Sequence, residues 1–95
     1  MVKWSKIAID DLRGIYDYIS KDSVVYAKKV INEIINKTDY LEEYHNIGRA
    51  VPELSNERIR ELMIYSYRMI YQVENGDVEI LTLVHSRKNF YLEIE

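Results

Sequence analysis

The sequence predicts an α+β domain, in the order β-α-α-β-β-β, with an antiparallel helix hairpin packed on one face of a mainly antiparallel sheet. Apolar residues recur at helical spacing through residues 5–44, a stretch containing Gly and Pro ends that pattern, and three strand-like runs follow. Helices that precede an antiparallel meander are typical of this class. The 95 residues, 1–95, are expected to form a single domain, because a chain of this length builds one core.

The first half of the chain reads as a short edge strand at 2–4 followed by two helices. The first helix is expected over about Ser5–Ser20, with Ser5 as N-cap. The second is expected over about Ser23–Tyr44, capped by Asp22 or Ser23. The apolar stripes are Ala8, Leu12, Ile15 and Ile19 in the first helix and Ala27, Val30, Ile31, Ile34, Ile35, Thr38 and Leu41 in the second.

The second half begins with the loop NIGRAVPELSNE, whose proline forbids a continuing helix. Strands are expected over Arg58–Tyr65, Tyr67–Glu74 and Asp77–His85. The pair Asn75-Gly76 joins the last two, and Asn-Gly between strand runs predicts a two-residue type I′ hairpin turn.

That turn sets a predicted register in which Glu74 pairs with Asp77, Tyr71 with Ile80, and Arg68 with Leu83. Strand alternation then assigns the faces. The face under the helices is expected to carry Tyr67, Met69, Tyr71, Val73, Val78, Ile80, Thr82 and Val84, and the open face Arg68, Ile70, Gln72, Glu79, Leu81, Leu83 and His85.

The same register makes Arg68 and His85 diagonal neighbours on the open face, with Arg87 and Lys88 just beyond. This gathering of cations is the candidate functional site. The structural alternative is that Arg68 pairs with Glu61. Arg58 and Arg60 share a parity on their strand, and the sequence does not place them on the face of Arg68.

Composition narrows the classes of function. The net charge of −3 argues against nucleic-acid binding driven by overall charge, while every Arg except Arg13 lies from Arg49 onward, which favours a local basic site. The absence of Cys excludes thiol chemistry and is typical of a cytoplasmic protein. The sequence has no apolar run long enough to suggest a signal peptide or a membrane-spanning segment, so we expect no membrane among its partners. The two histidines are far apart in sequence, so we expect no metal site and no cofactor.

Five motifs resemble the RelE/ParE superfamily of toxins from type II toxin–antitoxin pairs. They are AIDDLRGIYDYISKDS, GRAVPEL, IREL, YRMIYQV and ILTLVHSRK, in the order and spacing of that superfamily from Trp4 to about Tyr91. The resemblance implies the same β-α-α-β-β-β fold and a cognate antitoxin, with which the chain would form a hetero-oligomer.

The resemblance implies two competing activities, and the motifs look more like the ParE branch, whose members inhibit DNA gyrase. RelE-like members instead cut mRNA on the ribosome, without a metal. If the chain is such an RNase, we expect Arg68, His85 and Arg87 to be catalytic: Arg68 and Arg87 match the RelE pattern loosely, and His85 is an unusual but chemically able substitute as acid or base. The further binding residues are Arg58, Arg60, Lys88, Phe90 and Tyr91, although Tyr91 lies closer to Arg87 than the tyrosine of the RelE pattern. A third hypothesis is a decayed or purely structural module.

Tyrosines are numerous in the predicted helices, beyond what two stripes on a small sheet easily bury. They are Tyr16, Tyr18, Tyr26, Tyr40 and Tyr44. We expect an antitoxin segment to cover part of this surface with aromatic and apolar contacts. The alternative is that they lie along the core edge with their hydroxyls in water.

Overall fold

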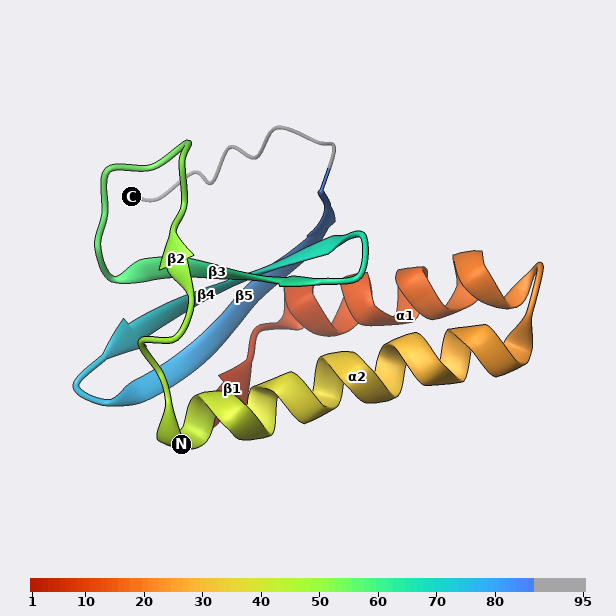
Figure 1. The fold of residues 1–95 in the computed structure, drawn as a ribbon, viewed down its shortest axis with the longest axis horizontal. Helices are drawn as coiled ribbons and strands as arrows, with labels where there is room; N and C mark the ends of the chain where they lie inside the picture. Colours follow the sequence, from red (N-terminus) through yellow and green to blue (C-terminus); the bar gives the residue numbers. More distant parts are fainter. Residues whose placement is uncertain (87–95) are drawn as a thin grey trace.

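A computed structural model describes residues 1–86 and confirms the predicted α+β fold. The elements are β1 (Val2–Trp4), α1 (Lys6–Ser20), α2 (Val24–Glu43), β2 (Arg49–Ala50), β3 (Ile59–Ile64), β4 (Tyr67–Glu74) and β5 (Asp77–His85). The strands form one sheet of order β1-β5-β4-β3-β2, in which β1 runs parallel to β5 and the other neighbours are antiparallel. The two helices lie side by side along one face of this sheet (Figure 1).

The strand β2 is the one element of this fold that the sequence analysis placed in a loop. Its two residues pair with Glu61 and Arg60 of β3. So short a strand carries no alternation of its own and exists because β3 offers an edge to it.

Within residues 1–86, neither helix is long and apolar enough to cross a lipid bilayer.

Serine side chains start both helices at the predicted positions. The Ser5 hydroxyl accepts the backbone N–H of Ala8 at 3.0 Å and donates to the carbonyl of Leu81 at 2.8 Å. The Ser23 hydroxyl accepts the N–H of Tyr26 at 3.1 Å. Each cap satisfies a backbone donor that the first helical turn leaves unpaired. The second bond of Ser5 also ties the start of α1 to β5.

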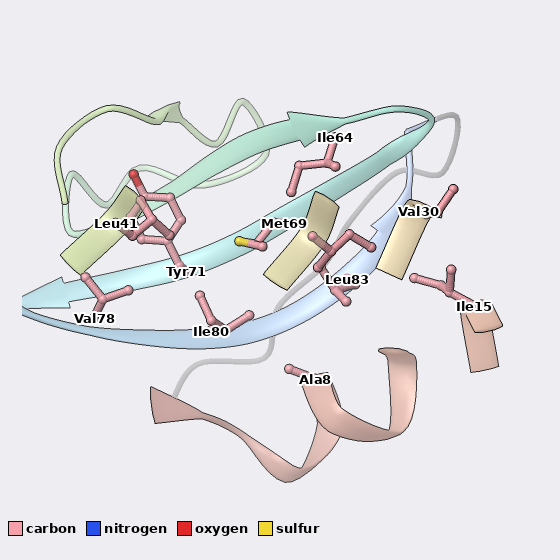
Figure 2. Packing of buried hydrophobic residues seen from close by; sticks show 11 residues of the cluster. Ala8, Ile15, Val30, Leu41, Ile64, Met69, Tyr71, Val78, Ile80 and Leu83 are labelled. Carbon is pink, nitrogen blue, oxygen red and sulfur yellow. The ribbon is translucent and has the colours of Figure 1, made fainter. Parts of the chain in front are cut away.

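The main core lies between the helices and the sheet (Figure 2). Tyr71 and Ile80 are fully buried there, as predicted, against Leu41 of α2. Burying one such side chain contributes about 1.5–3 kcal/mol relative to leaving it in water. The labelled members of this cluster are Ala8, Ile15, Val30, Leu41, Ile64, Met69, Tyr71, Val78, Ile80 and Leu83.

The other face of the sheet, predicted to be open, is partly covered. Val51 from the loop after β2 packs with Ile59 and Ile70, and all three are at most 1% exposed. Leu54, Leu81 and Val84 pack around them. The loop therefore forms a second, smaller core, and side chains beneath it are shielded from water.

The hairpin turn is confirmed, and the register beyond it is partly wrong. Asn75 and Gly76 have φ of 52° and 81°, as a type I′ turn requires, and Tyr71 pairs with Ile80. The register then shifts between Ile70 and Tyr71, so that Arg68 pairs with Val84 instead of Leu83. Because side chains alternate with period two, the extra residue places the side chains of Leu83, Val84 and His85 on the face opposite the predicted one.

The register shift has two consequences for the faces of the sheet. Leu83 joins the core under the helices, where Figure 2 shows it, while Val84 packs on the other face. The shift is stabilised from α1, because the carboxylate of Asp11 accepts the backbone N–H of Leu83 at 3.1 Å and the hydroxyl proton of Thr82. A contact between helix and strand thus holds the irregular part of β5.

Candidate functional site

Arg68, the centre of the predicted cationic site, is enclosed by two carboxylates. Its Nη2 donates to Oε1 of Glu61 at 2.6 Å, and its Nε reaches the same oxygen at 2.9 Å. Its Nη1 and Nη2 donate to the two oxygens of Glu53 at 2.8 and 2.7 Å. Arg49 of β2 donates to the second oxygen of Glu61 at 2.7 Å. We call Arg49, Glu53, Glu61 and Arg68 the ion-pair network.

The ion-pair network is largely shielded from solvent at its centre. The side chains of Arg68 and Glu61 are 7% and 0% exposed. Hydrogen bonds to Glu53 and then to Glu61 raise the pKa of Arg68, against the opposing effect of its burial. A buried charge is tolerated only when it is paired in this way. The structural alternative, pairing of Arg68 with Glu61, is confirmed, and the guanidinium edges that a phosphate would need are already occupied by carboxylates.

Arg58 and Arg60 do not join Arg68 in one basic surface. Arg60 lies opposite Tyr71, on the face away from Arg68, and its Nη1 donates to the carbonyl of Gly48 at 2.9 Å. Arg58 is exposed just before β3, with its Nη1 3.9 Å from Oε1 of Glu74. The structure therefore places the three arginines in three separate environments.

His85 lies on the helix side of the sheet, so its predicted diagonal contact with Arg68 on the open face is wrong. It pairs with Tyr67, and the two rings meet edge to face with centroids 5.7 Å apart. The cause is the register shift in β5, which separates His85 from Arg68 by the thickness of the sheet. The remaining predicted site residues, Arg87, Lys88, Phe90 and Tyr91, lie outside the described residues.

An open cavity of about 810 Å³ lies next to His85, at the end of the molecule where the two helices join. Its lining residues come from α1, the start of α2, the turn between β3 and β4, and the end of β5. We call it the tyrosine groove after Tyr18, Tyr26, Tyr65 and Tyr67, which line it. A cavity of this size is typical of binding sites.

The tyrosines of the groove come close to one another. The rings of Tyr26 and Tyr65 meet edge to face with centroids 6.3 Å apart. The pKa of Tyr67 is raised, first by burial and then by the neighbouring phenols of Tyr18 and Tyr26. Tyr18 is nonetheless 70% exposed and Tyr26 47% exposed, so the groove presents aromatic surface to solvent.

Only part of the predicted tyrosine surface belongs to this groove. Tyr18 and Tyr26 line it, whereas the rings of Tyr40 and Tyr44 lie near each other at the far end of α2, tilted by 36° with centroids 5.5 Å apart. Tyr65 was not expected on this surface, because helix and strand periodicity do not report that the hairpin between β3 and β4 brings it to the helices. The sequence feature that could have indicated this position was the pair of tyrosines on either side of Ser66, between two expected strands.

Within residues 1–86, no three His, Asp or Glu side chains are grouped to hold a metal ion.

Comparison with known proteins places the chain in a family. Residues 2–90 match a family described as the ParE toxin of type II toxin–antitoxin systems, parDE. Toxin RelE2 of Caulobacter vibrioides is 32% identical over 88 residues, which are 92% of this chain and 96% of that protein.

Solved structures agree on the fold. A structure described as the chromosomal ParDE system from P. aeruginosa superposes with a TM-score of 0.71 at 24% identity, covering 88% of this chain and 92% of that one. A YoeB-YefM complex from Staphylococcus aureus gives a TM-score of 0.56 at 16% identity, covering 96% of this chain and 97% of that one. The chain therefore belongs to the ParE toxin family of type II toxin–antitoxin systems, within the RelE/ParE superfamily.

Proposed function

We propose that this toxin acts in the cytoplasm by binding DNA gyrase and blocking its cycle, and that a cognate antitoxin neutralises it. One observation carries the choice of gyrase over mRNA. Arg68, which an RNase on this fold would need for phosphate charge, is held by Glu53 and Glu61 on the face opposite His85. Family membership over residues 2–90 supports the same choice.

Inhibition of gyrase requires a contact surface rather than an assembled catalytic site. We propose that this surface begins at His85 and continues through Phe90, with Arg87 and Lys88 supplying charge. His85 stands at the end of β5, partly exposed, where a strand end can meet another protein.

The antitoxin partner is supported by the molecule's exposed aromatic surface and by its relatives. Tyr18 and Tyr26 lie together in the tyrosine groove and are 70% and 47% exposed, so the groove presents a contiguous aromatic surface of the kind that a partner covers. The similar structures are described as a ParDE system and as YoeB-YefM complexes. We propose a toxin–antitoxin hetero-oligomer with the product of the adjacent reading frame.

The alternative activity is cleavage of mRNA on the ribosome. A ribose 2′-OH would attack the adjacent phosphate, forming a 2′,3′-cyclic phosphate and releasing the 5′-oxygen, which takes up a proton. In that mechanism His85 moves the proton, and Arg68 and Arg87 neutralise the phosphate. For Arg68 to do so, a phosphate must replace the carboxylate of Glu53 or Glu61, which removes Arg68 from that carboxylate.

The deciding experiment measures both activities on the same protein preparation. One reaction contains gyrase, ATP and relaxed plasmid, and the other contains programmed ribosomes with a defined mRNA. We expect supercoiling to stop and the mRNA to stay intact. Cleaved mRNA with normal supercoiling would assign the RNase activity instead, and a folded protein without either effect would assign the decayed module. The antitoxin, purified separately, should restore supercoiling.

A further inference from the structure

The aromatic rings of the tyrosine groove come from three separate parts of the chain. Tyr18 lies in the last turn of α1 and Tyr26 in the first turn of α2, while Tyr65 and Tyr67 flank the turn between β3 and β4. Tyr65 has a φ of 53°, a backbone conformation that is costly for a residue of this size. The turn therefore holds an aromatic side chain against Tyr26 at some conformational expense.

The rim of the groove is acidic. Asp10 and Asp22 both line it, and neither carboxylate makes a hydrogen bond or ion pair with another residue in the range 1–86. Asp11 also lines the groove, but its carboxylate is engaged by Thr82 and by the backbone of Leu83. Within the described part of the chain, two carboxylates thus lie without a paired cation beside a set of exposed aromatic rings.

This combination defines the chemistry of what it binds. The faces of tyrosine rings attract a guanidinium or ammonium group, and nearby carboxylates strengthen that attraction. The apolar floor, formed by Ile15, Ile19, Val30 and Leu83, needs aliphatic or aromatic side chains to exclude water. An acidic segment would place like charges beside Asp10 and Asp22, which costs binding energy.

We propose that the tyrosine groove docks a segment of the antitoxin in which an arginine or lysine lies among apolar residues. The cation stacks against Tyr18 and Tyr26 and pairs with Asp22, while its apolar neighbours cover the floor. The inference rests on the proposed antitoxin partner and adds the site and the chemistry of recognition. A segment bound there lies next to His85, where the proposed gyrase surface begins.

The test uses the full-length chain and the separately purified product of the adjacent reading frame. Titration calorimetry compares the wild type with Tyr18→Ala and Asp22→Asn. The matched controls are Tyr40→Ala, an exposed tyrosine at the far end of α2, and Asp39→Asn, an exposed acid of the same helix. We expect each groove variant to raise Kd about 10-fold or more, as for an aromatic anchor at an interface, and each control to stay within about two-fold.

A second comparison tests the charge. Added salt should weaken the wild-type complex more than the Asp22→Asn complex, because the variant has lost an attractive charge. Each arginine and lysine of the antitoxin is then replaced by Gln in turn. For the residue that pairs with Asp22, the replacement should cost much less affinity against Asp22→Asn than against the wild type.

The remaining outcomes each overturn a different statement. Groove variants that bind the antitoxin like the wild type would overturn the docking site while leaving the antitoxin partner in place. If Tyr18→Ala then dissociated a dimer of the free chain, a second copy of this chain would be the occupant. No complex with the wild type at micromolar concentration would overturn the antitoxin partner itself, and inhibition of gyrase would still be judged by its own assay.

Discussion

The guanidinium of Arg68 on β4 lies 2.6 Å from the carboxylate of Glu61 on β3, and Glu61 is fully buried. The pair joins two central strands beneath a loop that supplies a second carboxylate, Glu53. Its position between two strands of the sheet makes it a structural contact.

Arg68→Ala should destabilise the fold by about 3–5 kcal/mol, because it leaves the buried carboxylate of Glu61 with Arg49 alone. Urea unfolding followed by circular dichroism measures this. Arg58→Ala is the control, since its partner Glu74 lies 3.9 Å away at the surface, and it should change stability by less than about 1 kcal/mol. Equal effects from the two variants would contradict a structural role for the ion-pair network.

Gly48→Ala and Gly14→Ala should change stability in opposite directions. A Cβ at Gly48 would lie 2.5 Å from the hydroxyl of Tyr71 and 2.6 Å from the carbonyl of Glu61, and it would disturb the 2.8 Å bond from the Gly48 N–H to Tyr71. We expect a loss of about 1–3 kcal/mol there. A Cβ at Gly14 meets nothing within 4 Å, and alanine in a helix should add about 0.5–1 kcal/mol. Thermal unfolding distinguishes the two signs.

Stability should fall as the pH rises above about 10. The pKa values of Tyr67 and Tyr71 are raised above 10.0, chiefly by burial, so the folded state holds these protons more tightly than the unfolded chain does. Their contribution is complete below the unfolded value and is lost as the pH rises through the folded values. Tyr67→Phe should make the decline shallower, whereas Tyr40→Phe, at an exposed position, should leave it unchanged. Urea midpoints between about pH 9 and about pH 11.5 provide the measurement.

Alanine substitutions at Arg87, Lys88 and Phe90 should weaken inhibition of gyrase gradually. If the proposed gyrase surface is correct, each substitution removes one of its several contacts, so we expect the inhibitory concentration to rise about 2- to 10-fold per residue. Loss of a catalytic group would instead cost roughly 100-fold or more in rate. The supercoiling assay with graded toxin concentrations separates the two patterns, and a 100-fold loss from one substitution would contradict the surface-contact mechanism.

Local patterns determined most of the fold. Ser5 and Ser23 cap the helices where the sequence indicated, because a cap is a contact over three residues. Asn75-Gly76 determined the last hairpin and the pairing of Tyr71 with Ile80, because only a few residues tolerate the φ values of a type I′ turn. The resemblance of five motifs identified the superfamily, which the match over residues 2–90 confirms.

Tertiary contacts decided where the functional side chains lie. The register shift beside Ile70 depends on Asp11, 71 residues away from Thr82, and no strand pattern reports it. That shift moved His85 away from Arg68, and the loop carrying Glu53 closed over Arg68. The tyrosine groove likewise exists only because a hairpin turn reaches two helix ends. Periodicity specifies which side of a regular element a residue occupies, whereas contacts between distant segments determine which residues finally meet.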